Sequence, residues 1–245
     1  MIMSGDVRQT VQVSVLLPCF NEQAALPSVI RDICAVMDAA PYSYEILVVD
    51  DKSSDSSAGI AAAHGCRVVR HGFNRGAGAA RKTGILAAHG EMIVMLDADG
   101  SYPAADVPRA IALLDRYDQV NGVRSKERGT LVWLRQPTKW FIRMLASFLA
   151  GQKIPDLNTG FKVFRRDTML PYLWCIPDGF SCVTSMTLAF ICNGLSVGYI
   201  PIGYNARIGR SKFHPIRDTF NYVLTVLRLV TYFKPLKVYF PVAFF

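Results

Sequence analysis

The chain has 245 residues, 51% of them hydrophobic, and a net charge of +8, which is enough material for one large domain with its own core. The excess of positive charge points to a nucleic acid, an anionic membrane or a phosphorylated substrate. No helix-turn-helix, RRM or zinc-finger pattern occurs, so nucleic acid is not expected as a partner. The six cysteines form no CxxC pair and the four histidines lack metal-ligand spacing, which favours reduced, buried thiols over disulfides or zinc.

The first half of the chain alternates strand and helix patterns. Strands are predicted where β-branched and aliphatic residues run together, at residues 11–18, 44–49, 66–70, 92–96 and 119–123. Helices are predicted between them from apolar spacing, N-cap residues and proline. They fall at residues 24–39, 79–89 and 103–116, and another follows the turn at residues 52–55 and ends at residue 63. A further strand is predicted at residues 162–165. This order predicts an α/β fold whose sheet is doubly wound, mostly parallel and flanked by helices.

Polar side chains follow three of these strands. They are Asn21 and Glu22 after the first, Asp50 and Asp51 after the second, and Asp97 and Asp99 after the fourth. Ligands of open parallel sheets bind at the carboxyl ends of strands, where these groups meet in one crevice. Two carboxylates one residue apart are costly to hold together without a cation, and hard oxygen ligands suit Mg²⁺ or Mn²⁺ and therefore a diphosphate. The alternative is a strand that ends in a polar turn.

Basic residues gather in the second half of the chain. Residues 124–135 carry four cations and one acid, which suits a mobile loop over the site or a plain solvated loop. The segment Thr138–Ala150 sets Lys139 and Arg143 beside tryptophan and phenylalanine, as at an anionic membrane surface or in a buried packing helix. The segment Arg207–Lys212 holds three cations and a hydroxyl group, which favours a phosphate clamp over a basic surface loop.

The composition of the C-terminal region predicts a membrane-facing extension. Residues 216–233 are amphipathic, and lysines follow them beside aromatic residues, a composition typical of a membrane interface. The apolar run Val238–Phe245 has eight residues, whereas about 20 are needed to span a bilayer. The chain is therefore expected either to be cut before transmembrane helices or to lie on the membrane. No signal peptide is expected, because Met1–Gln12 lacks an apolar core.

Four motifs in order resemble the family 2 glycosyltransferases with a GT-A fold. They read VSVLLPCFNE, EILVVDDKSSD, NRGAGA and MLDADGSYP. Two later segments, DLNTGFKVFRRD and RIGRSK, are similar to the polyprenyl-phosphate branch, which includes dolichyl-phosphate mannose synthases. The resemblance implies an inverting, Mg²⁺- or Mn²⁺-dependent transfer of a sugar from a nucleotide-diphosphate sugar to a polyprenyl phosphate, undecaprenyl or dolichyl, at the cytoplasmic face of the membrane.

The resemblance also implies three groups of site residues. The residues that would bind the nucleotide are Pro18, Asn21, Glu22, Asp50, Asp51, Gly76, Asp97 and Ala98. The metal would be bound by Asp97 and Asp99, with Asp99 the more direct ligand. The other catalytic residues would be Asp156, Arg207, Arg210 and Lys212. The acceptor phosphate would be bound by Arg124, Arg135, Lys139 and Ser211. Many relatives carry a glutamine two residues after the second acid, where this chain has Ser101.

Asp156 stands where many inverting GT-A enzymes place a base. A phosphate monoester has a second pKa near 6, so a polyprenyl phosphate is already ionised and needs cations rather than a base. We therefore rank a role of Asp156 in orienting an arginine or the loop above proton abstraction. The rival hypotheses are a family 2 transferase that acts on a saccharide hydroxyl, with Asp156 as the base, and a nucleotide-binding module without turnover.

The sequence predicts one catalytic domain over residues 1–212 and a juxtamembrane extension over residues 213–245. Expected partners are the sugar donor, the lipid acceptor and membrane lipids. The sugar, the base, the polyprenol and the oligomeric state stay open, a homo-oligomer among the options.

Overall fold

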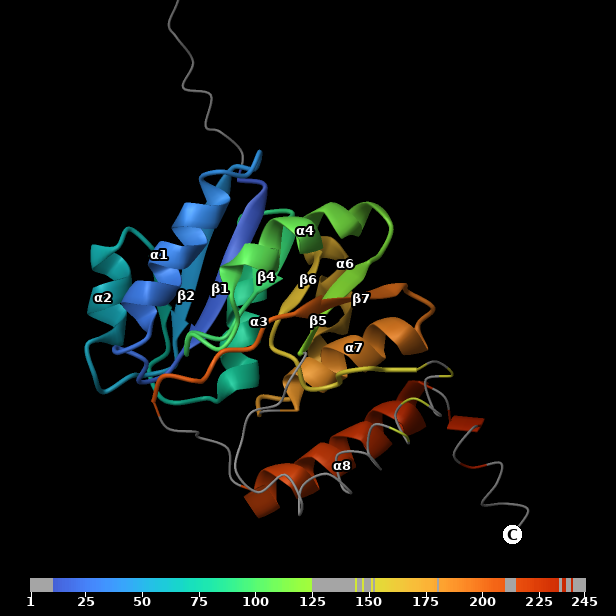
Figure 1. The fold of residues 1–245 in the computed structure, drawn as a ribbon. Helices are drawn as coiled ribbons and strands as arrows, with labels where there is room; N and C mark the ends of the chain where they lie inside the picture. The colour runs from blue at the N-terminus through green and yellow to red at the C-terminus, as the bar shows by residue number, and fades with distance from the viewer. Residues whose placement is uncertain are drawn as a thin grey trace, which may run out of the picture.

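A computed structural model describes residues 11–124, 144, 147, 151, 153–179, 181–209, 215–233, 235–236 and 239. In this part of the chain, seven strands form one sheet in the order β3-β2-β1-β4-β6-β5-β7 (Figure 1). The strands are β1 (Val13–Cys19), β2 (Tyr44–Asp50), β3 (Arg67–Arg70), β4 (Met92–Met95), β5 (Gln119–Arg124), β6 (Lys162–Arg165) and β7 (Val197–Ile202). The six predicted strands lie within two residues of the observed ones, and the predicted mostly parallel α/β sheet is confirmed.

Strand β6 departs from the doubly wound pattern. It lies between β4 and β5 and runs antiparallel to both, whereas the other strand pairs of the sheet are parallel. The first residue of β6, Lys162, therefore pairs with Met95, the last residue of β4. Consequently, the residues just before β6 lie beside the acidic turn just after β4.

Helices cover both faces of the sheet (Figure 1). The helices of the described part of the chain are α1 (Leu26–Met37), α2 (Ser57–Ala63), α3 (Ala77–Ala87), α4 (Val107–Ala112), α6 (Arg166–Met169), α7 (Cys182–Cys192) and α8 (Pro215–Phe233), of which α8 lies apart from the sheet (Figure 1). Along β1, Val15 and Leu17 pack into the core cluster that contains α1 and α4, while Leu16 packs into the one that contains α3 and α7. The predicted helix at residues 103–116 is α4 flanked by two short 3₁₀ turns, η1 (Ala104–Asp106) and η2 (Leu113–Asp115).

Helix α8 lies outside this two-faced arrangement and packs on α7. Leu229 of α8 is buried in a small cluster with Leu188 and Ile191 of α7. In Figure 1, α8 lies below α7, away from the sheet. None of the helices in the described part of the chain combines the length and apolar character that crossing a bilayer requires.

A buried polar cluster joins β5, β6 and α7. The Lys162 amine donates to the Thr187 hydroxyl at 2.6 Å and to the Asn121 side-chain oxygen at 3.1 Å. Gln119 donates to the same two oxygens at 3.2 and 2.7 Å. Burial lowers the pKa of Lys162 to about 7, since the low-dielectric core disfavours its charged form.

Replacing Lys162 with methionine is expected to flatten the rise of stability with pH. The folded-state pKa lies below the unfolded value of about 10.4, so between pH 7 and pH 10 only the unfolded chain keeps this proton. The free energy of unfolding of the parent then rises by roughly 1.4 kcal/mol per pH unit over that window. Gln119 still donates to Asn121 and Thr187 in the variant. Urea unfolding at several pH values measures this; equal slopes in both proteins, or the same flattening on replacing the exposed Lys153 with methionine, would contradict it.

Candidate active site

The two acids after β4 are each paired with an arginine from elsewhere in the chain. Asp97 lies 2.5 Å from the Arg81 guanidinium of α3, and Asp99 lies 2.5 Å from Arg207, which follows β7. A divalent cation was expected beside these carboxylates, but Arg81 was not predicted as a residue of the site. A single arginine among the small residues GAGAA-R of α3 was the signal available, since small residues mark the face that packs against the sheet.

Asp99 and its neighbours offer oxygen atoms that suit a hard divalent cation. The Asp99 carboxylate accepts a hydrogen bond from the Ser101 backbone N–H at 2.9 Å. The Ser101 hydroxyl is buried and has no hydrogen-bond partner among the described residues. No group of three or more His, Cys, Asp or Glu side chains in the described ranges has the geometry of a metal site. Mg²⁺ is commonly held by one or two carboxylates together with water and substrate phosphates, so this donor set fits such an ion.

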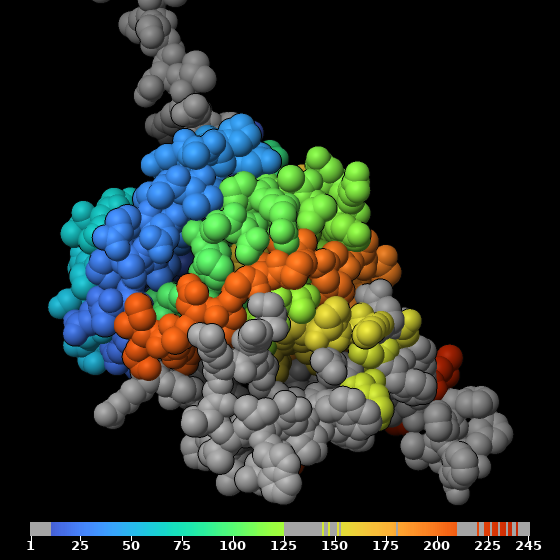
Figure 2. All heavy atoms as spheres, viewed as in Figure 1, coloured from blue at the N-terminus to red at the C-terminus, as the bar shows by residue number. Residues whose placement is uncertain are grey.

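The segment that carries Arg207 lies against the turn after β4. The Asn205 N–H donates to the Ser101 carbonyl at 2.9 Å, and the Ile208 N–H donates to the Asp99 carbonyl at 3.0 Å. In Figure 2 this segment, in orange, runs across the face of the molecule shown there. The acidic turn and one cation of the predicted phosphate clamp are therefore brought together. Arg210, Ser211 and Lys212 of the clamp, and Arg135 and Lys139 of the predicted acceptor site, lie outside the described residues.

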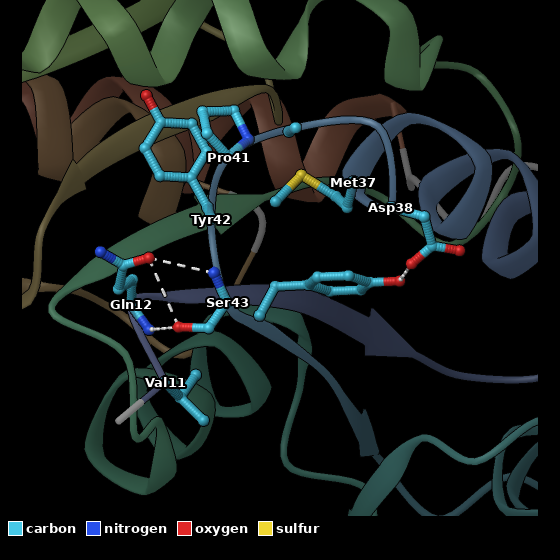
Figure 3. A pocket seen from close by; sticks show the side chains of 9 residues that line it. Val11, Gln12, Met37, Asp38, Pro41, Tyr42 and Ser43 are labelled. Carbon is cyan, nitrogen blue, oxygen red and sulfur yellow. Dashed lines mark hydrogen bonds between the residues drawn. The ribbon is translucent and has the colours of Figure 1, made fainter. Parts of the chain in front are cut away.

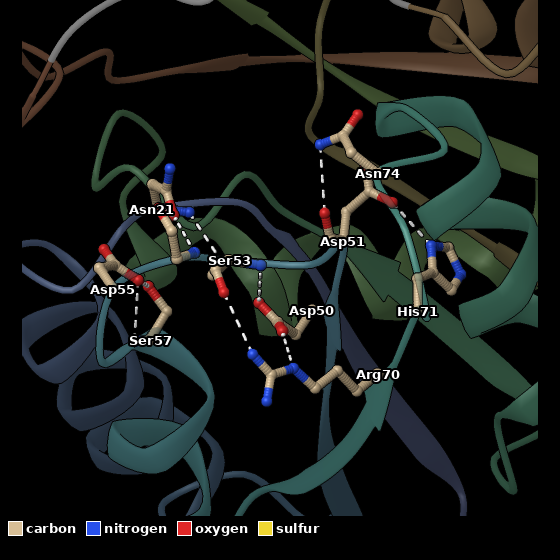
Figure 4. Close-up of polar contacts among 10 residues, drawn as sticks. Asn21, Asp50, Asp51, Ser53, Asp55, Ser57, Arg70, His71 and Asn74 are labelled. Carbon is tan, nitrogen blue, oxygen red and sulfur yellow. Dashed lines mark hydrogen bonds and ion pairs between the residues drawn. The ribbon is translucent and has the colours of Figure 1, made fainter.

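The two acids at the end of β2 face different partners (Figure 4). Asp50 lies 2.9 Å from the Arg70 guanidinium, and it accepts the Ser53 N–H at 3.1 Å. Asp51 lies 2.7 Å from His71 and accepts hydrogen bonds from the backbone N–H groups of Arg75 and Gly76 at 2.8 and 2.7 Å. These contacts hold the glycine-rich loop in place. Both carboxylates are buried. Through these contacts the two carboxylates hold the loops beside the predicted nucleotide site in place.

The loop after β1 interlocks with the loop after β2. Asn21 has a left-handed backbone (φ 54°), and its side-chain oxygen accepts the Ser54 N–H at 2.8 Å. The Glu22 N–H donates to the Ser57 hydroxyl at 2.9 Å. The polar ends of β1 and β2 therefore converge at one edge of the sheet, as the sequence predicts.

The glycine-rich turn before α3 is covered by another loop. The Gly78 and Ala79 N–H groups donate to the Asp178 carbonyl at 2.7 and 3.3 Å. A Cβ atom on Gly76 would lie 2.6 Å from the same carbonyl oxygen. Glycine is therefore required at residue 76 for close packing, and the Asp178 carbonyl, rather than open solvent, faces the first N–H groups of α3.

Asp156 accepts two hydrogen bonds from the Arg124 guanidinium and one from the Arg124 backbone N–H. The Arg124 Nε and Nη2 atoms donate to the two carboxylate oxygens at 2.7 and 2.9 Å. The Asn158 N–H also donates to this carboxylate at 3.1 Å. Burial alone would raise the pKa of Asp156, but the Arg124 guanidinium and the backbone N–H groups of Asn158 and Arg124 together outweigh burial and lower it. Arg124 also lies over the Tyr204 ring, 5.3 Å from its centre. The arginine that Asp156 contacts is thus one of the predicted acceptor-site residues.

A surface hollow of about 750 Å³ lies at the other end of the sheet (Figure 3). Its lining includes Gln12 and Ser43, which precede β1 and β2, and Asp38, which accepts a hydrogen bond from the Tyr44 hydroxyl at 2.6 Å. Because these residues precede the strands, the hollow is separate from the acidic edge.

A mostly parallel sheet of this order, with acids at the carboxyl ends of its strands, defines the GT-A class of fold. The chain superposes on glucosyl-3-phosphoglycerate synthase from Mycobacterium tuberculosis with a TM-score of 0.73, over 90% of this chain and 80% of that one, at 22% sequence identity. The model of Glycosyl transferase family 2 matches residues 14–170, and the chain belongs to this family. The family and the fold predicted from the motifs are confirmed.

Two curated relatives carry names that match the predicted branch. A dolichyl-phosphate hexose transferase of Haloferax volcanii is 31% identical over 82% of this chain and 86% of its own length. An undecaprenyl-phosphate 4-deoxy-4-formamido-L-arabinose transferase of Enterobacter sp. is 35% identical over 67% of this chain. This chain spans 52% of the length of that second relative.

Proposed function

We propose that this chain transfers a sugar, with inversion, from a nucleotide-diphosphate sugar to a polyprenyl phosphate at the cytoplasmic face of a membrane. The observation that carries the proposal is the Asp156–Arg124 pair. An acid held by two hydrogen bonds from a guanidinium is a poor base, but the pair suits an acceptor that arrives ionised. The names of the two relatives support the same acceptor class.

The reaction needs cations more than proton transfer. An oxygen of the acceptor phosphate forms a bond to the anomeric carbon while the bond from that carbon to the diphosphate oxygen breaks, which releases the nucleoside diphosphate. Arg124 and Arg207 would bind the phosphate groups, because guanidinium matches phosphate oxygens in geometry and charge. Asp99 and Ser101 would hold Mg²⁺ or Mn²⁺, which when bound supplies positive charge beside the leaving diphosphate. A solved structure of the same fold contains Mn²⁺ and uridine-diphosphate-glucose.

Replacing Asp156 with asparagine tests the proposal. We expect a loss of less than about tenfold in transfer to a soluble polyprenyl phosphate, because no proton has to be removed, and removal of a general base would cost roughly 10²–10⁴-fold. Initial rates with the parent and the variant, at saturating donor, measure the difference. Replacing the exposed Asp178, which pairs with Lys82, controls for the loss of one charge. A loss near 10⁴-fold with intact donor binding would favour the hydroxyl-acceptor rival, and no transfer by the parent would overturn the proposal.

The exposed face of α8 supports attachment to a membrane. Phe220, Leu224 and Leu227 follow one another at helical spacing, Tyr232 lies further along the helix, and the four side chains are 40–64% exposed. The exposed Trp174 ring packs 4.7 Å from the Tyr232 ring. Aromatic residues beside an apolar helix face are typical of an interfacial helix. We infer that α8, within the predicted extension from residue 213, lies on the membrane surface.

Neutralising five cations should release the protein from anionic vesicles. The residues are Lys139, Arg143, Arg228, Lys234 and Lys237, and each cation near an anionic surface is worth about 1 kcal/mol. Sedimentation with vesicles at low and high salt measures binding, and we expect the parent to bind more weakly as salt rises. The variant should keep donor binding and lose more activity on a membrane-embedded acceptor than on a short soluble one.

A control for this experiment neutralises Arg31 and Arg116, which are both exposed. Arg31 lies on α1 and Arg116 follows η2, and both are on the face of the sheet opposite α7. It should bind vesicles almost like the parent. Equal losses on both acceptors, or a parent that stays in the supernatant at low salt, would show that the membrane assignment is wrong.

A further inference from the structure

Arg81 is buried directly behind the acidic turn. Only 6% of its surface is exposed, although arginine is rarely buried unless it is paired. Its Nη2 atom lies 2.5 Å from Asp97 Oδ1, and its Nη1 atom lies 3.2 Å from the Cys182 sulfur of α7. The guanidinium therefore links α3, the end of β4 and the start of α7.

The other side of Asp97 is closed by backbone. A Cβ atom on Gly160 would lie 2.6 Å from Asp97 Oδ2, so the chain before β6 passes against this carboxylate. The Gly160 N–H donates to the Tyr102 hydroxyl at 2.7 Å, which fixes that approach. Asp97 is thus held between a buried cation and a glycine, and its carboxylate has little freedom to turn.

Asp99 has a different kind of partner. Its arginine, Arg207, belongs to the surface segment after β7, and the Arg207 side chain is 32% exposed, against 7% for Arg81. The acids differ in the opposite sense, since the Asp99 side chain is 3% exposed and that of Asp97 is 25% exposed, so a divalent cation reaches Asp99 by replacing Arg207. Water and phosphate can then take over the contacts of Arg207, whereas removal of Asp97 would leave the buried Arg81 charge uncompensated. A divalent cation on Asp97 would also stand beside the fixed Arg81 charge and be repelled by it.

We propose that Arg81 is a positioning residue for the nucleotide-sugar site, which acts through Asp97 and holds that carboxylate away from the divalent cation. Arg81 holds Asp97 in one orientation at the edge where the donor binds. This inference rests on the proposed function. The resemblance to the family already implies that Asp99 is the more direct ligand of the metal, and the inference gives Asp97 a separate role.

A cycle of variants tests whether Arg81 acts through Asp97. The variants are Arg81→Met, Asp97→Asn and the double variant, and the readout is the affinity for UDP, GDP or TDP in the presence of Mn²⁺, measured by calorimetry. We expect Arg81→Met to weaken binding by about tenfold in the parent background and to have almost no effect in the Asp97→Asn background. Lys82→Met, which removes the neighbouring cation of α3, should leave binding unchanged.

Electron paramagnetic resonance of Mn²⁺ with the same nucleotide tests the division of roles. We expect Asp99→Asn to weaken Mn²⁺ binding by about a hundredfold and Asp97→Asn by less than about tenfold. If Arg81→Met does not fold, Arg81→Lys, which keeps the charge and loses the second hydrogen bond, is compared in the same two backgrounds.

Two results would overturn the inference while the parent still binds nucleotide: additive losses in the cycle, or equal losses of Mn²⁺ affinity in the two aspartate variants. A parent that binds none of UDP, GDP and TDP in Mn²⁺ would instead remove the proposed function, and the inference with it.

Discussion

Replacing Asp99 with alanine is expected to abolish sugar transfer and the metal-dependent binding of nucleotide, while the fold survives. The carboxylate lies in the turn after β4, and its main partners are the Ser101 N–H and the partly exposed Arg207. Arg207 can be hydrated in the variant, and the buried Ser101 N–H loses its acceptor, which costs about 1–3 kcal/mol of the free energy of unfolding, a loss that the fold should survive. The loss of a direct ligand removes the cation that would bind the diphosphate.

A thermal-shift screen with UDP-, GDP- and TDP-sugars and Mn²⁺ measures this prediction. A ligand at a hundredfold excess over its Kd adds about 2.7 kcal/mol to the stability of the parent, and the variant should show no such shift. Replacing Asp115, which is exposed and remote from the turn after β4 in the fold, with alanine should leave the shift intact. Unchanged Mn²⁺-dependent affinity in the Asp99 variant would refute the metal role.

Replacing Gly160 with alanine is expected to lower activity by roughly 10²-fold, the cost of displacing a site group by about 1 Å. The new Cβ atom would lie 2.6 Å from Asp97 Oδ2 and 2.8 Å from its Cγ, so the carboxylate or the strand must move. Asp97 cannot move inward, because the buried Arg81 occupies that side. Overpacking of this kind also costs about 1–3 kcal/mol of stability.

Steady-state rates and thermal unfolding of the Gly160 variant measure the two effects. Gly59→Ala is the matched control, because nothing lies within 4 Å of a Cβ atom at residue 59. That change lies in α2, where alanine favours the helix. Parent-like activity of the Gly160 variant would show that the position of Asp97 does not matter to the reaction.

Local sequence patterns predicted the first half of the fold well. Strands β1, β2 and β4 are largely buried, and each contains an apolar run, at residues 15–20, 46–49 and 92–96, that polar residues follow. Neither α7 nor β7 was predicted from the sequence. Residues 182–191 of α7 are buried on every side, so the helix lacks the apolar stripe from which a helix is recognised.

The sequence by itself determined which strand ends carry acids, because a parallel strand puts its last residues at one edge of the sheet wherever it stands in the strand order. Only the tertiary structure decided what faces those acids. The antiparallel entry of β6 places Gly160 against Asp97, and the packing of α3 and α7 buries Arg81 behind it. Both contacts join segments far apart in the chain, and no local pattern of residues encodes which distant segment will pack there.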